Sequence, residues 1–240
     1  MNGLLAALAF LTRLPLPARP FDARSQASSL AWYPLVGLLL GAVLALLAWL
    51  LRGAPPMVGA VLVLAAWVAL TGALHLDGLA DSADAWVGGL GDRGRTLAIM
   101  KDPRCGPAGV TALVLVLLGK FAALAGAPGA HALMLLLAPL LARAMLVALC
   151  LWTPYVRGGG LGTGLRDAPG TACRAALAAT VLVCLCAGWR GWLALAVALA
   201  VFAGWRHAGL RRLGGFTGDT AGALAELVEL AVVLALAAAG

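Results

Sequence analysis

Long apolar stretches with almost no charge dominate this chain, and they restrict its possible folds more than any motif does. Several of them approach or exceed the ~20 residues with which a helix crosses a bilayer. Of the 240 residues, 63% are hydrophobic and 11% are charged, whereas a soluble domain has roughly 25% charged residues. The sequence therefore predicts an all-α, polytopic bundle of membrane helices. We expect residues 1–240 to form a single integral-membrane domain, because no stretch is polar and long enough to be a linker between two domains.

The apolar stretches divide into seven expected transmembrane helices. These are residues 30–51, 56–76, 107–126, 130–152, 171–188, 190–205 and 220–239. The fifth and sixth are the least regular, because WRGW (189–192) separates them with tryptophans typical of a membrane interface. The first twelve residues, MNGLLAALAFLT, lack the basic start of a cleaved signal peptide, so we interpret them as an amphipathic or re-entrant segment.

Basic residues are concentrated in the loops that would share one face of this bundle. With a cytoplasmic N-terminus, those loops are 1–29, 77–106, 153–170 and 206–219. They and the adjoining helix starts hold Arg13, Arg19, Arg24, Arg93, Arg95, Lys101, Arg104, Arg157, Arg166, Arg174, Arg206, Arg211 and Arg212. The opposite face holds Arg52 and Arg190. The positive-inside rule therefore predicts a cytoplasmic N-terminus, and it accounts for the net charge of +7 without a nucleic-acid partner.

Acidic residues are scarce, and all of them are expected on that cytoplasmic face, in its loops or at its helix ends. In HLDGLADSADAWVGG (75–89), Asp77, Asp81 and Asp84 have the i, i+4, i+7 spacing of one helix face. Stacked like charges repel, whereas a divalent cation such as Mg²⁺ or Mn²⁺ between them removes the repulsion. A solvated acidic helix end is the alternative interpretation. His75 could be a base, a metal ligand or a hydrogen-bonding residue at the helix end.

A second acidic group occurs in GGFTGDTAGALAELVEL (214–230). Asp219 and Glu226 are seven residues apart and would share a helix face, while Glu229 lies one turn further into an apolar stretch. Ionisable residues at membrane depth usually line a polar cavity or form pairs. Two acidic stripes on different helices predict a metal site between them. Its predicted ligands are Asp77, Asp81, Asp84, Asp102, Asp219 and Glu226.

Basic and glycine-rich segments near the acids are suited to phosphate. IMKDPRCGPAGV (99–110) offers two cations beside Asp102, and RRLGGFTGD (211–219) places two arginines and several glycines before a helix start. Arginine binds phosphate in a bidentate way, and glycine-rich turns expose N–H groups to anions. The glycines of 158–167 could form another such loop or a flexible connector. The predicted phosphate-binding residues are Lys101, Arg104, Arg211, Arg212, Arg143, Gly214 and Gly215.

Two basic residues and five cysteines require separate interpretations. Arg143 lies in the middle of an expected span, so we expect it to face an internal cavity, whereas Lys120 could either do the same or extend to the interface. The cysteines lack metal-ligand spacing and are interpreted as packing residues. No nucleotide-binding loop of the Walker type, Ser–His–Asp arrangement or zinc motif is present. These features together predict phosphoryl or nucleotidyl transfer from a diphosphate-linked donor at a membrane face.

Five segments of the chain resemble the cobalamin synthase family, whose members are adenosylcobinamide-GDP ribazoletransferases. They are FLTRLPLP (10–17), YPLVGLLLG (33–41), HLDGLADSADAWVGG (75–89), MKDPRCGPAGV (100–110) and GGFTGDTAGALAELVE (214–229). The resemblance implies that adenosylcobinamide-GDP and α-ribazole, or its 5′-phosphate, react with release of GMP. It also implies Mg²⁺ as cofactor and a location in the bacterial inner membrane. The proline and cysteine of MKDPRCG depart from the family pattern.

The resemblance further implies roles for individual residues. Mg²⁺ on the aspartates of 77–84 would bridge the donor diphosphate, and the acceptor 5′-oxygen would attack the phosphorus nearer cobinamide. Asp81, central in the stripe, is the first choice for an indispensable carboxylate. Asp77, Asp219 and His75 are the other catalytic candidates, and Asp219 and Glu226 would complete the metal shell or act as base. The sequence leaves open whether the chain forms a homo-oligomer.

Two other classes of membrane protein share some of these features. Lipid-forming CDP-alcohol phosphotransferases also carry an Asp-Gly motif on a membrane helix, but theirs continues with Ala-Arg, whereas Leu79-Ala80-Asp81 follows Asp77-Gly78 here. An ion-coupled carrier would place charges near the membrane midplane in two related halves. No internal repeat is visible, so the sequence favours the enzyme.

Overall fold

A computed structural model of the chain describes residues 2–16, 22–127, 131–157, 164–165 and 168–239. This part is almost entirely helical, and its only strand-like feature is an isolated bridge between Tyr155 and Phe216. The helices are α1 (Asn2–Leu11), α2 (Ala23–Ser29), η1 (Leu30–Trp32), α3 (Tyr33–Leu50), α4 (Pro56–Thr71), α5 (Leu74–Gly88), α6 (Arg93–Ile99), α7 (Pro107–Gly126), α8 (His131–Trp152), α9 (Gly170–Cys186), α10 (Gly188–Leu213) and α11 (Gly218–Ala238). The all-α prediction is confirmed.

The described residues contain five helices long and apolar enough to cross a membrane, or six if α4 and α5 form one bent span. The five are Ala23–Leu50, Pro107–Gly126, Ala132–Trp152, Gly188–Leu213 and Gly218–Ala238. The prediction of seven full spans is therefore wrong in two places. The span expected at 56–76 is broken near its end, and the span expected at 171–188 is the 17-residue helix α9. The protein is nevertheless a polytopic membrane bundle.

The break between α4 and α5 turns the chain by 87° just before the three aspartates. Gly72 (φ 60°) and Ala73 (φ 56°) both adopt left-handed backbone, which ends α4 and starts α5 in a new direction. This conformation is unfavourable for alanine. A Cβ at Gly72 would also overlap the side chain of Arg13, whose N–H donates to the carbonyl of Leu70 at 2.8 Å. The segment after α1 therefore packs on the break and leaves room there only for glycine.

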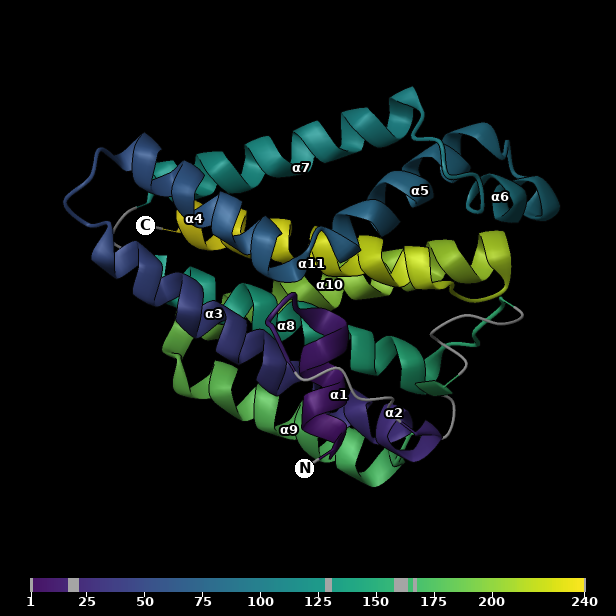
Figure 1. The fold of residues 1–240 in the computed structure, drawn as a ribbon, viewed down its shortest axis with the longest axis horizontal. Helices are drawn as coiled ribbons and strands as arrows, with labels where there is room; N and C mark the ends of the chain where they lie inside the picture. Colours follow the sequence, from purple (N-terminus) through teal and green to yellow (C-terminus); the bar gives the residue numbers. More distant parts are fainter. Residues whose placement is uncertain (1, 17–21, 128–130, 158–163, 166–167, 240) are drawn as a thin grey trace.

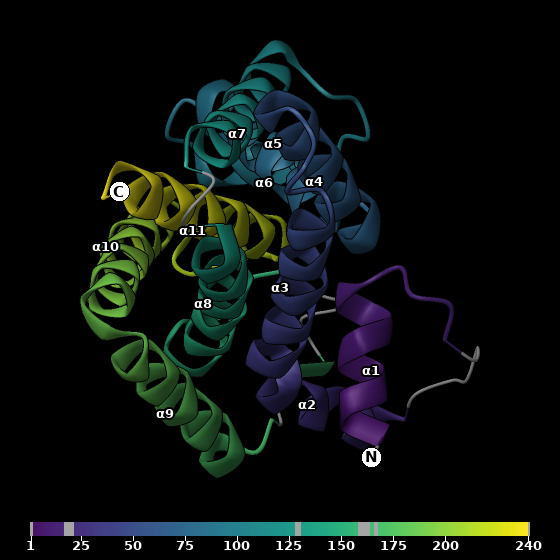
Figure 2. The same ribbon diagram turned by 90° about the vertical axis from the view of Figure 1, so that its left-hand side faces the viewer.

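Close backbone contact joins α3 to α8. Gly37 and Gly41 are four residues apart, and a Cβ on either would overlap a carbonyl oxygen of α8, at Pro139 and Leu135 respectively. Small residues at this spacing let membrane helices approach closely. As Figure 2 shows, α8 lies inside the bundle, and α3, α9, α10 and α11 pack around it.

The connections of the bundle gather at two opposite ends. The end of α5, α6 and the turn between α10 and α11 lie on the right of Figure 1, whereas the loop between α3 and α4 and the C-terminus lie on the left. The long central helix α11 contacts α5, α7, α8 and α10 along its length. The aspartate-bearing helix α5 and the start of α11 are therefore brought to the same end of the bundle.

Candidate active site

The three aspartates of α5 lie along one helix as their spacing predicts. Asp77 is exposed, while Asp81 and Asp84 are half-buried. Asp81 lies at the centre of the group, where the negative charges of Asp77, Asp84 and Asp219 all act on it. Within the described part of the chain, the side chains of Asp77 and Asp81 have no hydrogen bond or ion pair. These two carboxylates are thus available to a ligand at the end of the bundle.

Asp219 reaches this group because α5 and α11 cross in very close contact. A Cβ on Gly78 would lie 2.7 Å from the carbonyl oxygen of Asp219. A Cβ on Gly222, about one turn along α11, would lie 3.2 Å from the carbonyl oxygen of His75. The first contact excludes a Cβ at Gly78, and the second leaves only a tight fit for one at Gly222. The crossing therefore fixes where Asp219 stands relative to the aspartates of α5.

The start of α11 is fixed by its own cap. The Thr217 side chain accepts a hydrogen bond from the N–H of Thr220, and the Thr220 side chain accepts one from the N–H of Thr217 in return, which forms a capping box. Asp219 lies in the first turn that follows. The helix dipole favours a carboxylate there.

Arg157 is a functional candidate, although in the sequence it stands out only as one of the loop cations. Its Nη1 donates to Oδ2 of Asp219 at 2.9 Å, and the two side chains remain 29% and 19% exposed. The bridge between the segment after α8 and the turn before α11 positions this pair, since the N–H of Phe216 donates to the carbonyl of Pro154 at 2.9 Å. The partners are 62 residues apart in sequence, so no local pattern indicated their contact.

Asp84 has a structural partner that its spacing did not indicate. Its Oδ2 accepts from the N–H of Gly106 at 2.6 Å and its Oδ1 from the N–H of Gly109 at 2.9 Å. Gly106 is the N-cap residue of α7, so Asp84 binds free N–H groups at the start of that helix. This carboxylate ties α5 to α7, and both of its oxygens are engaged.

Glu226 and Glu229 were expected in loops or at helix ends, but they lie inside α11. There they form a buried cluster with Lys120 and Arg143. Nζ of Lys120 donates to Glu226 at 2.7 Å and to Glu229 at 2.5 Å, and Nη1 of Arg143 donates to Glu229. All four side chains are at most 5% exposed. Lys120 therefore does not extend to the interface. The structure gives Glu226 a cationic partner and Arg143 an acidic one, where a metal and a phosphate were expected.

His75 lies beside this cluster, in the field of Lys120 and Arg143. It is 5% exposed, and its Nε2 has no hydrogen-bond partner among the described residues. The buried Nε and Nη2 of Arg143 likewise have none in the described part. The crossing of α5 and α11 thus separates an open group of aspartates from a sealed polar cluster. His75 is on the sealed side.

Apart from Arg143, the predicted phosphate-binding residues lie near the same end as the aspartates but are not gathered into one pocket. Arg104 donates to Asp102 through Nε at 2.9 Å and Nη2 at 2.6 Å, and this bonding holds the pKa of Asp102 at about 2. Arg212 donates to the carbonyl of Trp86 at 2.8 Å. Lys101 and Arg211 are exposed. Arg104 and Arg212 are engaged within the chain, whereas Lys101 and Arg211 project freely from it.

The glycines before α11 serve the backbone. Gly214 (φ 74°) ends α10 in a left-handed conformation, and a Cβ on Gly215 would overlap the carbonyl of Pro154. Residues 158–163 and 166–167 of the glycine-rich segment, Arg166 included, lie outside the described residues.

The carboxylates of the site meet only part of the requirements of a divalent cation by themselves. Within the described residues, no group of three or more His, Cys, Asp and Glu is close enough to hold a metal ion by itself. Mg²⁺ usually takes only one or two protein carboxylates, with substrate phosphates and water completing its shell. The open oxygens of Asp77 and Asp81 match that donor set. Asp102 and Glu226 match it less well, because each already forms an ion pair, with Arg104 and Lys120 respectively.

Comparison with known proteins gives a consistent result over nearly the whole chain. The family model of cobalamin-5-phosphate synthase matches residues 3–237. A curated protein from Stutzerimonas stutzeri, adenosylcobinamide-GDP ribazoletransferase, is 59% identical over 99% of this chain and 98% of its own length. Proteins of that name from Pseudomonas paraeruginosa and Pseudomonas aeruginosa are 56% and 55% identical, again over 99% of this chain and 98% of their own. No solved structure matches significantly.

Proposed function

The chain belongs to the cobalamin-5-phosphate synthase family, and we propose that it carries out its reaction at the carboxylates of α5 and α11. The function is that of its relatives: a transferase that joins adenosylcobinamide-GDP to a ribazole and so assembles the nucleotide loop of cobalamin. The observation that carries the proposed location is the approach of Asp219 from α11 to Asp77 and Asp81 of α5. Here two unpaired carboxylates of α5 meet a carboxylate of α11 that is held by Arg157 and remains partly exposed.

We propose Mg²⁺ as the cofactor, held by Asp77 and Asp81 together with the substrate diphosphate. When bound, Mg²⁺ supplies positive charge that offsets the charge of the diphosphate and makes its phosphorus easier to attack. The repulsion that Asp77, Asp84 and Asp219 exert on Asp81 supports a cation at this place, because a cation converts it into attraction.

The residues of the chain have separate roles in the proposed reaction. Arg157 orients Asp219 through Nη1 and Oδ2, and its remaining N–H groups can bind the departing phosphate. Asp219 Oδ1 then takes the proton of the attacking hydroxyl. Lys101 and Arg211, which project freely at this end, attract the anionic donor.

The bond changes follow from the two substrates. The acceptor hydroxyl oxygen forms a bond to the phosphorus that carries cobinamide. The bond from that phosphorus to the bridging oxygen breaks, GMP leaves with the bridging oxygen, and the hydroxyl proton goes to Asp219. A new phosphodiester therefore joins cobinamide to the ribazole.

The family's name bears on which hydroxyl attacks. A product that carries a 5-phosphate, as the name cobalamin-5-phosphate states, keeps that phosphate on the 5′-oxygen of the ribose. This oxygen cannot also form the new phosphodiester, contrary to the expectation from the sequence. We therefore propose α-ribazole 5′-phosphate as the acceptor and another ribose hydroxyl as the nucleophile.

Turnover of the purified protein in detergent tests the proposal. Adenosylcobinamide-GDP, Mg²⁺ and either α-ribazole or its 5′-phosphate would be supplied, and mass spectrometry would follow the products with and without EDTA. We expect equimolar GMP and condensed product, lost in EDTA and restored by Mg²⁺. Turnover that survives EDTA would contradict the metal proposal. Consumption of CDP-diacylglycerol in place of the corrinoid would favour a phospholipid-forming enzyme.

The bacterial inner membrane, with the aspartates facing the cytoplasm, is our proposal for the location. It is supported by the concentration of basic residues in the loops at the same end as α6. A cytoplasmic site is also where a guanosine diphosphate ester would be available.

A further inference from the structure

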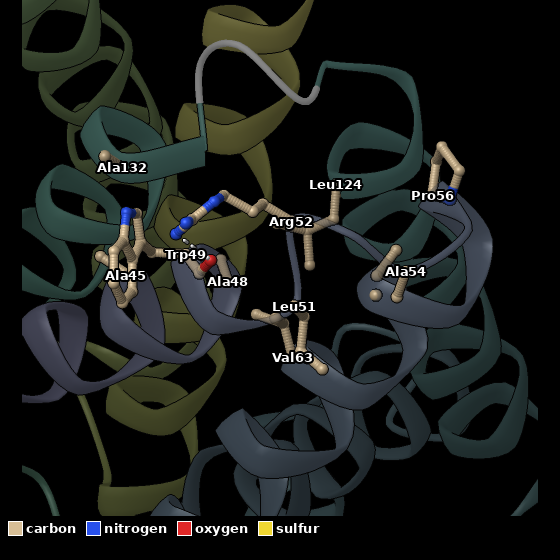
Figure 3. Close-up of a pocket in the computed structure, with 12 residues that line it drawn as sticks. Ala45, Ala48, Trp49, Leu51, Arg52, Ala54, Pro56, Val63, Leu124 and Ala132 are labelled. Atoms are coloured by element: carbon tan, nitrogen blue, oxygen red, sulfur yellow. Dashed lines mark hydrogen bonds between the residues drawn. The ribbon is translucent and has the colours of Figure 1, made fainter.

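A cavity lies at the end of the bundle opposite to the aspartates. It has a volume of about 270 Å³, is partly open to the outside, and is lined by the end of α3, the start of α4, and residues of α7 and α8 (Figure 3). Its walls are mainly small apolar side chains, including Ala45, Ala48 and Ala60, with Val63 and Leu124 deeper in the bundle. Nothing in the transferase reaction uses this cavity.

One charged residue, Arg52, stands among the described residues that line it. Its guanidinium lies 4.2 Å from the centre of the Trp49 ring, and Nη1 donates to the Trp49 carbonyl at 3.3 Å. The side chain of Arg52 has no other hydrogen bond to a described residue, so most N–H groups of its guanidinium are free for an anion. The cavity therefore combines an apolar interior with a cation at its edge.

The surroundings of the cavity are those of a membrane surface. Leu50 and Met57, beside it at the ends of α3 and α4, are 63% and 69% exposed, and Trp49 is 57% exposed. Tryptophan and arginine are typical of the level at which lipid headgroups meet the acyl chains. Alanine walls offer water no hydrogen bonds, so an apolar occupant is favoured over water.

We propose that this cavity binds an anionic phospholipid of the bilayer, with one acyl chain between α3, α4, α7 and α8 and the headgroup phosphate on Arg52. Charge complementarity selects an anionic lipid, and the apolar walls select a chain. The site is independent of the aspartates, and its test requires no turnover. The bound lipid would fill the gap between α3 and α4.

Native mass spectrometry of the delipidated protein in detergent tests the proposal. Phosphatidylglycerol and phosphatidylcholine with identical acyl chains would be titrated separately. We expect wild-type protein to retain one phosphatidylglycerol with clear preference over phosphatidylcholine. We expect Arg52→Gln to lower that preference about fivefold, because one basic residue near an anionic lipid contributes about 1 kcal/mol. Arg190→Gln is the matched control, since Arg190 also lies over a tryptophan, Trp189, on the same face of the membrane.

A second variant tests the chain-binding part. Ala48→Phe places a ring in the cavity and should abolish retention of either lipid, and Ala45→Phe gives the same test from another wall position if the first variant folds poorly. Equal retention of the two lipids by wild-type protein would overturn the proposal. So would an unchanged preference in Arg52→Gln, or normal retention in a folded phenylalanine variant.

Discussion

Asp81 illustrates a conflict between stability and function within one residue. The negative charges of Asp77, Asp84 and Asp219 all act on it. Among the described residues, Asp219 has a cationic partner, Arg157, whereas Asp84 accepts only uncharged backbone N–H groups. A chain selected for stability alone would avoid this arrangement. The repulsion is what a cation-binding site requires before the cation arrives.

Replacing Asp81 with asparagine should therefore have opposite effects on the two properties. We expect turnover to fall by about 10²–10³-fold, the loss typical of removing one electrostatic group from an active site. In EDTA the thermal midpoint should rise, because the central negative charge is gone. Asp92→Asn is the matched control, since Asp92 caps α6 at the same end of the bundle and asparagine caps equally well. Near wild-type turnover of the Asp81 variant would remove this residue from the mechanism.

At the scale of helices, the contact between α5 and α11 determines the geometry of the site. Gly78→Ala should push the two backbones apart, because its Cβ would lie 2.7 Å from the Asp219 carbonyl. We expect a loss of about 1–3 kcal/mol in stability, with a larger proportional loss of turnover as Asp219 moves from its partners. Thermal unfolding in detergent and turnover would measure the two effects.

A glycine without such a contact provides the control for this variant. No atom lies within 4 Å of a Cβ built on Gly204, in the middle of α10. Gly204→Ala should therefore be neutral or stabilise by about 0.5–1 kcal/mol. Equal effects of the two substitutions would show that the crossing is not tightly constrained.

The buried charge cluster should be a major determinant of helix association. Arg143→Met leaves Glu229 with Lys120 alone, and removing one partner of a buried ion pair typically costs about 3–5 kcal/mol. Arg174→Met, at an exposed position of α9, should change stability by less than about 0.5 kcal/mol. Reversible unfolding in mixed micelles would compare the two. A similar midpoint for both variants would contradict a structural role for Arg143.

The contrast between these two groups of charges shows what could be predicted from the sequence. The stripe of Asp77, Asp81 and Asp84 was predictable because helical spacing is local. The partners of Glu226 were not, because Lys120 and Glu226 are 106 residues apart and meet only through the packing of α7 on α11. Depth in the membrane indicated that an ionisable residue needed a partner, but not which one.

At the scale of the whole molecule, hydropathy predicted the polytopic class and most of the helices but not how each one ends. The break in the second expected span lacks proline and depends on Gly72, Ala73 and the packing of Arg13. Helix α9 is apolar but short, and it packs on α8 and α10. Element ends depend on such tertiary contacts, which composition does not contain.

The two exposed cysteines allow the orientation of the whole molecule to be tested without adding a reporter. Cys105 lies in the loop between α6 and α7, at the end of the bundle that holds the aspartates, whereas Cys186 ends α9 near the start of α10. Cys173 and Cys184 are buried, and Cys150 is half-buried. A thiol reagent that does not cross membranes therefore has one accessible target at each end.

We expect Cys186 to react with a membrane-impermeant maleimide in intact bacterial spheroplasts, and Cys105 to react only after permeabilisation. The physical reason is that translocation of the basic loops is disfavoured, so the end bearing Cys105 stays in the cytoplasm. Single Cys105→Ser and Cys186→Ser variants would assign each signal. Labelling of Cys105 in intact spheroplasts would place the aspartates outside, where no guanosine diphosphate ester is available, and would contradict both the orientation and the proposed access of substrate to the site.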